Sequence, residues 1–163
     1  MTLRMFTVSA LYHFTRFDDP AALCPPMLSL CEHEGIKGTV LIAAEGINGT
    51  VAGPKQGISR LWHLIGALPG CSDFDHKESI AQSMPFKRMK VRLKKEIVTM
   101  GRPDVDPLSA TGNYVEAVDW NALIASPDVA VIDTRNDYEV GIGSFEGAVN
   151  PQTKTFREFP EWW

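Results

Sequence analysis

The sequence lacks any apolar run that approaches the roughly 18 residues needed to cross a bilayer, so we expect no membrane association. Its N-terminal stretch holds one basic residue and no long apolar core, which argues against a secretory signal peptide. Cysteine is scarce: Cys24, Cys31 and Cys71 are an odd number without regular spacing, and this argues against a disulfide framework. Together these shortages favour a protein of the reducing cytoplasm.

Signatures of metals and cofactors are missing as well. The four histidines, His13, His33, His63 and His76, show no ligand spacing, and the cysteines form no zinc pattern. No flavin, haem or iron motif is visible. We therefore predict no metal site and no visible cofactor, and we expect ordinary core or surface roles for the histidines.

Charge is distributed unevenly along a chain of otherwise ordinary composition. Hydrophobic residues make up 44% and charged residues 22% of the 163, which is typical of a soluble globular protein. Residues 87–95 contain six basic side chains and no acid, so the rest of the chain contains the remaining 10 of the 16 basic residues and all 20 acids. One concentrated positive strip in an otherwise acidic chain indicates a surface with a specific partner or a specific protective role.

The first part of the chain alternates strand and helix patterns. In chain order we predict strands at 7–15, 37–44, 49–53, 74–80 and 88–99, with helices opening at Pro20 and Pro54. The order β-α-β-β-α-β over roughly 90 residues is the ferredoxin-like pattern, which packs two helices on one face of an antiparallel sheet. The predicted fold class is therefore α+β.

A change of composition separates this part from the rest. Residues 101–113 read as a linker, because they begin with glycine, contain prolines and show no apolar period. We accordingly place an N-terminal domain at 1–100 and a second, partial domain at 114–163.

The second domain has little with which to build a core. We predict a short helix at 119–125, a buried strand at 129–133 and an amphipathic stretch at 156–163. Some 50 residues with one convincing strand bury little apolar surface by themselves. Trp162 and Trp163 would also form an exposed apolar patch. We therefore expect the natural protein to continue beyond Trp163.

The positive strip is the first candidate site. If residues 88–94 form a strand, alternate side chains point to opposite faces, so that four cations share one face. These four are Arg88, Lys90, Arg92 and Lys94, and Lys87 and Lys95 flank them. Such a ridge suits the phosphates of RNA or another polyanion. The alternative is a solvated edge strand, where lysine discourages aggregation.

Two further segments are candidates. The glycine-rich turn at 44–50 is best interpreted as a hairpin, although its backbone amides could also cradle a phosphate. Asp133 and Arg135 follow an apolar stretch, where α/β proteins build sites at the carboxyl ends of strands. A structural ion pair is the simpler interpretation of these two residues.

Several separated segments resemble one family. The stretch Val-Ile-Asp-Thr-Arg-Asn-Asp-Tyr-Glu-Val at 131–140 and Gly-Ala-Val-Asn-Pro at 147–151 resemble the opening of a rhodanese domain. Together with 44–50, 88–101 and Thr-Phe-Arg-Glu-Phe-Pro at 155–160, they resemble the rhodanese-related tRNA wobble-uridine hydroxylases.

This resemblance implies an oxygen-dependent conversion of wobble uridine to 5-hydroxyuridine in bacterial tRNA. It implies tRNA rather than DNA as partner and molecular oxygen as co-substrate, and it leaves the oligomeric state open. It also implies a ferredoxin-like domain followed by an α/β rhodanese-like domain, of which this chain holds the first part.

The resemblance further implies a nucleophilic cysteine on a loop of the form Cys-x-x-Gly-x-Arg, which favours the thiolate. None of the three cysteines begins such a pattern, so we assign no catalytic residue within this chain and expect that cysteine beyond Trp163. Asp133 and Arg135 match the rhodanese Asp-x-Arg and would support the active-site region. The positive strip becomes an expected RNA contact.

Two other functions remain open. A rhodanese-type sulfurtransferase would carry persulfide sulfur and transfer it to cyanide. A non-catalytic RNA-binding module would act through the basic strand alone, and its binding would weaken with salt.

Overall fold

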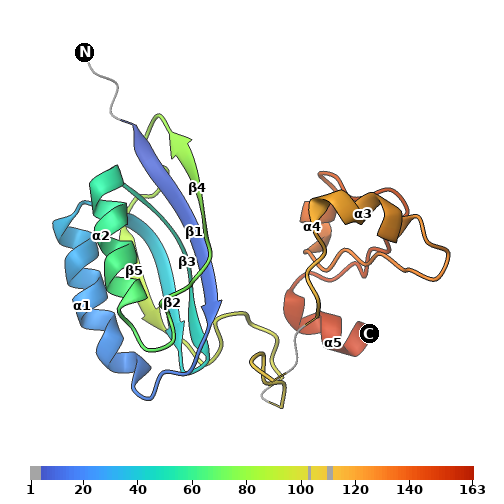
Figure 1. The fold of residues 1–163 in the computed structure, drawn as a ribbon, viewed down its shortest axis with the longest axis horizontal. Coiled ribbons are helices and arrows are strands. Elements are labelled where there is room, and N and C mark those ends of the chain that lie inside the picture. The colour runs from blue at the N-terminus through green and yellow to red at the C-terminus, as the bar shows by residue number, and fades with distance from the viewer. Residues whose placement is uncertain (1–4, 103, 110–111) are drawn as a thin grey trace. The chain divides into compact units, whose positions relative to one another are not determined.

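Two helices cover one face of a five-stranded sheet in the first part of the chain (Figure 1). The computed structural model describes residues 5–102, 104–109 and 112–163. The elements of this first part are β1 (Phe6–Phe14), α1 (Pro20–His33), β2 (Lys37–Ala43), β3 (Gly46–Gly53), α2 (Lys55–Gly66), β4 (His76–Ala81) and β5 (Met89–Leu93). The chain divides after Val98 into two compact units.

The strands lie in the order β4-β1-β3-β2-β5. The first four strands in this row pair antiparallel and confirm the predicted ferredoxin-like α+β fold. The expectation of a wholly antiparallel sheet is wrong for β5, which pairs parallel with β2. The physical reason is that β4 takes the place beside β1. Residues 82–88 therefore return the chain to the opposite edge, where β5 runs in the direction of β2.

The core lies between the sheet and the two helices. Side chains alternate along β2, so that Val40 and Ile42 point to the helices and are fully buried. Helix α1 packs on β2 and β5, and α2 packs on β1 and β3. The apolar stripe of α2, including Leu61 and Ile65, is buried against them. Each such side chain contributes about 1.5–3 kcal/mol by leaving water.

Helix α1 has well-defined ends. The Asp19 carboxylate accepts a hydrogen bond from the Ala22 amide at 3.1 Å, which caps the N-terminus. At the other end Gly35 adopts φ +67°, and the Ile36 amide donates to the Cys31 carbonyl at 2.8 Å. This 6→1 bond belongs to a Schellman motif and turns the chain directly into β2.

The hairpin between β2 and β3 is tighter than predicted. Its turn consists of two residues, Ala44 and Glu45, because β3 already begins at Gly46, which pairs with Ala43. The expected turn over 44–50 is therefore too long, and most of the glycine-rich segment is strand. Gly46 has φ +143°, and a Cβ there would collide with the carbonyl oxygen of His13. Close approach of the β1 backbone thus requires this glycine.

The predicted strand at 88–99 is also shorter in the structure, because β5 ends at Leu93. Beyond it the chain leaves the sheet edge, and Ile97 becomes buried with 2% of its surface exposed.

The second unit is built from short elements. They are α3 (Ala117–Ile124), α4 (Asp137–Val140), the 3₁₀ turn η1 (Phe156–Glu158) and α5 (Phe159–Trp162). The predicted buried strand at 129–133 is wrong: a single parallel bridge joins Ile132 to Val149, and Val131 and Ile132 are only half buried. One bridging partner fixes too few backbone hydrogen bonds for a strand to form.

The predicted linker at 101–113 is described only in part, since residues 103, 110 and 111 lie outside the described residues. Within the described part, the carboxylate of Asp104 pairs with the guanidinium of Arg102 at 2.6 Å. No helix among the described residues is long and apolar enough to span a membrane.

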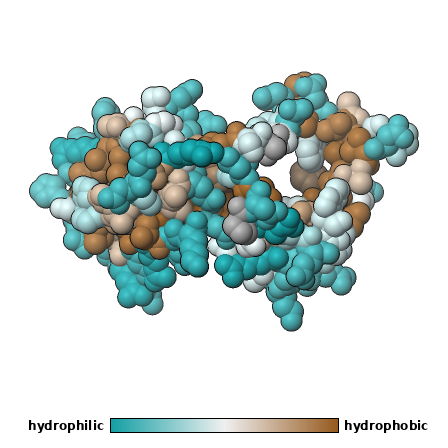
Figure 2. Space-filling model, turned by 90° about the horizontal axis from the view of Figure 1, so that it is seen from below, coloured by the Kyte–Doolittle hydropathy of each residue, from teal (hydrophilic) through white to brown (hydrophobic). Residues whose placement is uncertain are grey.

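Both units present hydrophobic residues among hydrophilic ones on the side seen in Figure 2. In the second unit Val118 is 85% exposed and Trp163 is 80% exposed. Single exposed apolar side chains are ordinary at protein surfaces and do not by themselves mark an interface.

Candidate functional site

Asp133 is the centre of the most highly connected polar cluster in the second unit. Its Oδ1 accepts hydrogen bonds from the backbone N–H and the Nε of Arg135, at 3.2 and 2.9 Å. Its Oδ2 accepts from Arg135 Nη2 at 2.6 Å and from the Ser144 hydroxyl at 2.7 Å. The same Nη2 also donates to the carbonyl of Gly143 at 2.7 Å. The pair therefore joins the loop after Ile132 to the loop at 143–145.

The backbone supports this arrangement. The Asp133 amide donates to the Val149 carbonyl at 3.0 Å, and the Val149 amide donates to the Val131 carbonyl at 2.8 Å. Asn136 and Glu139 form a capping box that starts α4 directly after Arg135. The backbone is thus held by hydrogen bonds to Val149 before the pair and by the start of α4 after it, which fixes the positions of Asp133 and Arg135.

The hydrogen bonds from Arg135, and next that from Ser144, hold the pKa of Asp133 well below its ordinary value. The carboxylate is therefore ionised at neutral pH, and both of its oxygens are engaged. A group in this state is a poor general base. It is well placed to hold Arg135, whose side chain is about half exposed, in one orientation.

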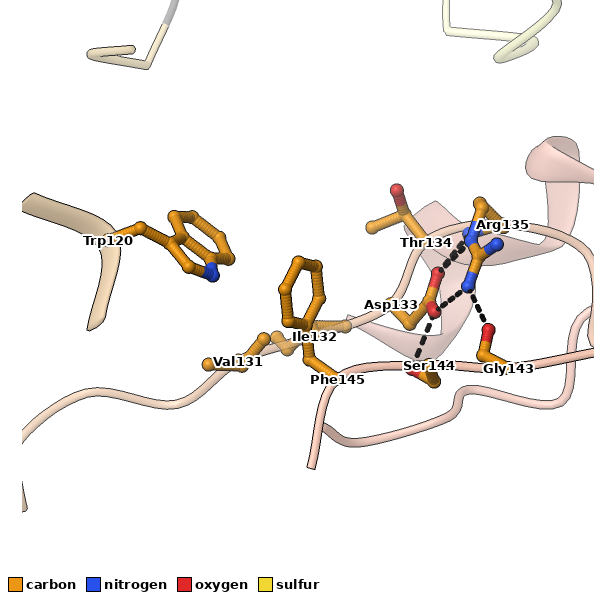
Figure 3. Close-up of a pocket in the computed structure, with 9 residues that line it drawn as sticks. All are labelled: Trp120, Val131, Ile132, Asp133, Thr134, Arg135, Gly143, Ser144 and Phe145. Carbon is orange, nitrogen blue, oxygen red and sulfur yellow. Dashed lines mark hydrogen bonds and ion pairs between the residues drawn. The ribbon is translucent and has the colours of Figure 1, made fainter. Parts of the chain in front are cut away.

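These residues line a pocket of about 520 Å³ (Figure 3). Trp120 and Phe145 stand at one end, with ring centroids 5.1 Å apart, and the Asp133–Arg135 pair stands at the other. The indole Nε1 of Trp120 is buried without a hydrogen-bond partner among the described residues. The pocket thus combines an apolar wall with a fixed cation.

Sequence reasoning found Asp133 and Arg135 but missed Trp120, Ser144 and Phe145. Trp120 comes from α3, and Ser144 and Phe145 come from a loop about ten residues after the Asp133–Arg135 pair, so no local sequence spacing joins these three to the pair.

The positive strip lies at an edge of the sheet, since β2 is the one partner of β5 among the described strands. Met89 and Val91 pack against the core, and by alternation Lys90 and Arg92 point to the opposite face. The predicted common face therefore holds for these two cations inside the strand. The other four, Lys87, Arg88, Lys94 and Lys95, lie beyond the ends of β5, where strand alternation no longer fixes their direction. Among the described residues none of the six cations forms an ion pair.

The hairpin at 44–50 performs a structural task that the sequence did not reveal. The Glu45 carboxylate accepts a hydrogen bond from the Ile97 amide at 2.6 Å, and the Asn48 side-chain amide donates to the Ile97 carbonyl at 2.8 Å. Both polar groups of one buried residue are thus held by the hairpin. We call Glu45 and Asn48 the Ile97 clamp. It anchors the chain two residues after Lys95, the last cation of the positive strip.

The cysteines are unsuited to nucleophilic chemistry. Burial, followed by the nearby charge of Glu32, raises the pKa of Cys31 to about 12. Burial also raises the pKa of Cys24 and of Cys71. Thiols in this state stay protonated at neutral pH and react slowly. In the part of the chain that the structure describes, no group of three or more His, Cys, Asp or Glu could hold a metal ion.

Comparison with known proteins gives a family match and close relatives. The family model described as the UPF0176 acylphosphatase like domain matches residues 6–97. A protein of Gluconobacter oxydans (strain 621H) named tRNA uridine(34) hydroxylase is 62% identical over 161 residues, which are 99% of this chain and 51% of that protein. A protein of the same name from Roseobacter denitrificans is 58% identical over 159 residues, covering 98% of this chain and 54% of that protein.

The chain therefore spans about half the length of the curated relatives it matches. Among solved structures, an acylphosphatase from Coxiella burnetii is similar at a TM-score of 0.41 and 13% identity, over 55% of this chain and 94% of that chain.

Proposed function

Because the chain belongs to the UPF0176 acylphosphatase-like domain family, we propose that it is the N-terminal part of a tRNA uridine(34) hydroxylase. The observation that carries this proposal is the extent of the identity to proteins of that name. It does not stop where the family match ends at residue 97, but continues through the second unit. A ferredoxin-like domain alone serves many functions, whereas both units together narrow the choice.

The positive strip supports tRNA as the partner. Six cations without ion-pair partners among the described residues lie on or beside an edge strand of an otherwise acidic chain. Binding to phosphates is mostly electrostatic, so unpaired cations contribute fully to it. We propose that Lys90 and Arg92 contact the tRNA backbone, with the four flanking cations adding to the same field.

We propose that Asp133 and Arg135 support the active-site region without taking part in proton transfer. The depressed pKa of Asp133 fits a positioning role, because the ionised carboxylate holds Arg135 at the pocket. The nucleophilic cysteine belongs to a Cys-x-x-Gly-x-Arg loop beyond Trp163, and the protonated state of the three cysteines in this chain supports that assignment.

The reaction replaces the hydrogen on carbon 5 of the wobble uridine by a hydroxyl group. We propose molecular oxygen as co-substrate. Insertion of one oxygen atom leaves the second atom to be reduced to water, so a two-electron donor takes part. Because tRNA is modified in the cytoplasm, we place the protein there.

The test is mass spectrometry of tRNA nucleosides from a bacterium that lacks its own hydroxylase gene. The strain receives the full-length Gluconobacter relative, residues 1–163 alone, or a chimera in which residues 1–163 replace the matching half of that relative. We expect the relative and the chimera to restore 5-hydroxyuridine-derived nucleosides, and residues 1–163 alone to restore none.

Three results would change the proposal. Restoration by residues 1–163 alone would show that the catalytic group lies within this chain. Failure of a stably expressed chimera would refute the hydroxylase function. Sulfur transfer to cyanide by such an inactive chimera would favour a sulfurtransferase.

The tRNA contact has its own test. Lys90→Glu and Arg92→Glu in the chimera should reduce nucleoside formation, while Lys55→Glu, an exposed cation at the start of α2, serves as the matched control. Loss of one phosphate contact lowers the slope of affinity against salt by about one. Equal activity and equal salt dependence in all three variants would leave the strip with only an edge-protecting role.

A further inference from the structure

One face of the sheet carries no helix among the described residues of the first unit, because α1 and α2 both lie on the other side (Figure 1). We call it the open face. Directly paired residues in neighbouring strands point to the same side of a sheet. Leu11 and Val40 point to the helices, so their neighbours Tyr12 and Leu41 point to the open face.

Register places two rows of side chains across this face. One row runs from β4 to β5 and consists of Lys77, Ala10, Thr50, Thr39 and Lys90. The next row runs from β1 to β5 and consists of Tyr12, Asn48, Leu41 and Arg92. The Asn48 side chain in this row is bonded to the carbonyl of buried Ile97, so the segment after β5 lies over the middle of the row and only the first row is open along its length. The middle of the first row is small and flat, and Thr50 and Ala10 are exposed. Three strand spacings, or about 14 Å, separate Tyr12 from Arg92.

Tyr12 is the most exposed of the aromatic strand residues that point to the open face. Its side chain is 46% exposed although it lies in the middle of a sheet next to a central strand. The ring of Phe14, two residues along the same strand and half buried, meets it edge to face with centroids 6.2 Å apart. This contact holds the Tyr12 ring in place while part of it stays accessible.

The charge of the open face has one sign. The strand residues that point to it include four cations, Lys37, Lys77, Lys90 and Arg92, and no acid. The acid of β4, Glu78, points to the helices and accepts a hydrogen bond from Trp62 at 3.2 Å. An exposed ring and cations on one face, with no carboxylate among its strand residues, form a combination that suits single-stranded nucleic acid: bases stack on the ring and phosphates contact the cations.

We propose that the open face binds a single-stranded stretch of RNA, with one base stacked on Tyr12 and phosphates contacted by Lys90 and Arg92. This inference rests on the proposed function, in which the substrate is a tRNA, and it makes the single-stranded loop that carries the wobble uridine the bound segment. Beyond contacts to the positive strip, the proposal specifies that the bound RNA crosses the sheet between β1 and β5. It also predicts a preference for unpaired RNA over duplex RNA.

The experiment measures fluorescence anisotropy of two labelled RNAs with residues 1–163: a stem-loop with a uridine-containing loop, and a blunt duplex of the same length. The parent should prefer the stem-loop. Tyr12→Ala should weaken stem-loop binding about 5- to 150-fold, the equivalent of the ~1–3 kcal/mol found for one stacked base. Duplex binding should not change. Tyr12→Phe should retain the affinity, because the ring is kept.

Controls separate stacking from folding. Tyr138→Ala removes an exposed tyrosine of the second unit and should change nothing. Thr50→Glu places a carboxylate in the middle of the open face and should weaken binding, whereas Thr50→Gln should not. This pair keeps the test valid if Tyr12→Ala unfolds, which circular dichroism would reveal.

Unchanged stem-loop affinity in folded Tyr12→Ala, or equal affinity of the parent for both RNAs, would overturn the proposal. The proposed function is judged separately by the chimera. A Tyr12→Ala chimera that forms the modified nucleoside as well as its parent refutes the open-face site and leaves the hydroxylase intact. Failure of the unmutated chimera refutes the hydroxylase, while the anisotropy result still decides the RNA site.

Discussion

Removal of the Ile97 clamp is the perturbation whose effect follows most directly from the structure. Glu45→Ala deletes the carboxylate that accepts the Ile97 amide at 2.6 Å and leaves that amide without its partner in a buried position. A hydrogen bond to a charged group contributes about 1.5–3 kcal/mol, and an orphaned buried donor costs a similar amount. Glu45→Gln keeps an acceptor of the same shape, so it should lose only the part of the hydrogen-bond free energy that the carboxylate charge contributes.

The assay is hydrogen exchange at the Ile97 amide, which reports local opening directly. Glu45→Ala should accelerate this exchange about 10- to 150-fold, because each 1.36 kcal/mol is a factor of ten. Asn48→Ala should have a smaller effect, since it removes a neutral bond to the Ile97 carbonyl. The double variant should cost less than the sum, because both side chains hold the same residue.

Exchange at Ile97 that stays at the parental rate in Glu45→Ala would refute this reasoning. It would mean that packing of the Ile97 side chain, and not the clamp, holds this segment. Loss of the clamp should also weaken RNA binding, because Lys94 and Lys95 come three and two residues before the anchored Ile97.

Two further predictions concern protonation. The pKa of Asp133 is depressed, so its stabilising contribution is present above the ordinary value of 3.8 and is lost as pH falls through the lower folded-state pKa. Asp133→Asn should therefore make the stability of the second unit less dependent on pH in this acidic window, as monitored by tryptophan fluorescence. An unaltered acid-unfolding profile would contradict this prediction. The pKa of Cys31 is raised to about 12, so stability should decline as pH rises from 9 toward 12, and native Cys31 should resist iodoacetamide while half-buried Cys24 reacts first. Mass spectrometry of alkylated peptides checks this order, and faster labelling of Cys31 than of Cys24 would contradict it.

The candidate site was predictable where its parts are neighbours in the sequence. Asp133 and Arg135 are two residues apart, so their pairing follows from local geometry. Ser144 and Trp120 join them only through folding, because they lie on other segments. The turn at 44–50 was recognised as special, yet its partner Ile97 lies about fifty residues away, so no periodic pattern could identify it.

The sequence by itself determined the two long helices, most of the strands and the contrast between the positive strip and the acidic remainder, because these depend on side-chain periodicity and composition. Tertiary structure alone decided that β5 lies parallel to β2 at the sheet edge, that the segment at 129–133 forms no strand, and that Tyr12 shares a face with Lys90 and Arg92. The physical reason is the same in each case. Strand order and register are set by contacts between distant segments, and a strand records in its own sequence which side chains alternate but not which strand lies beside it.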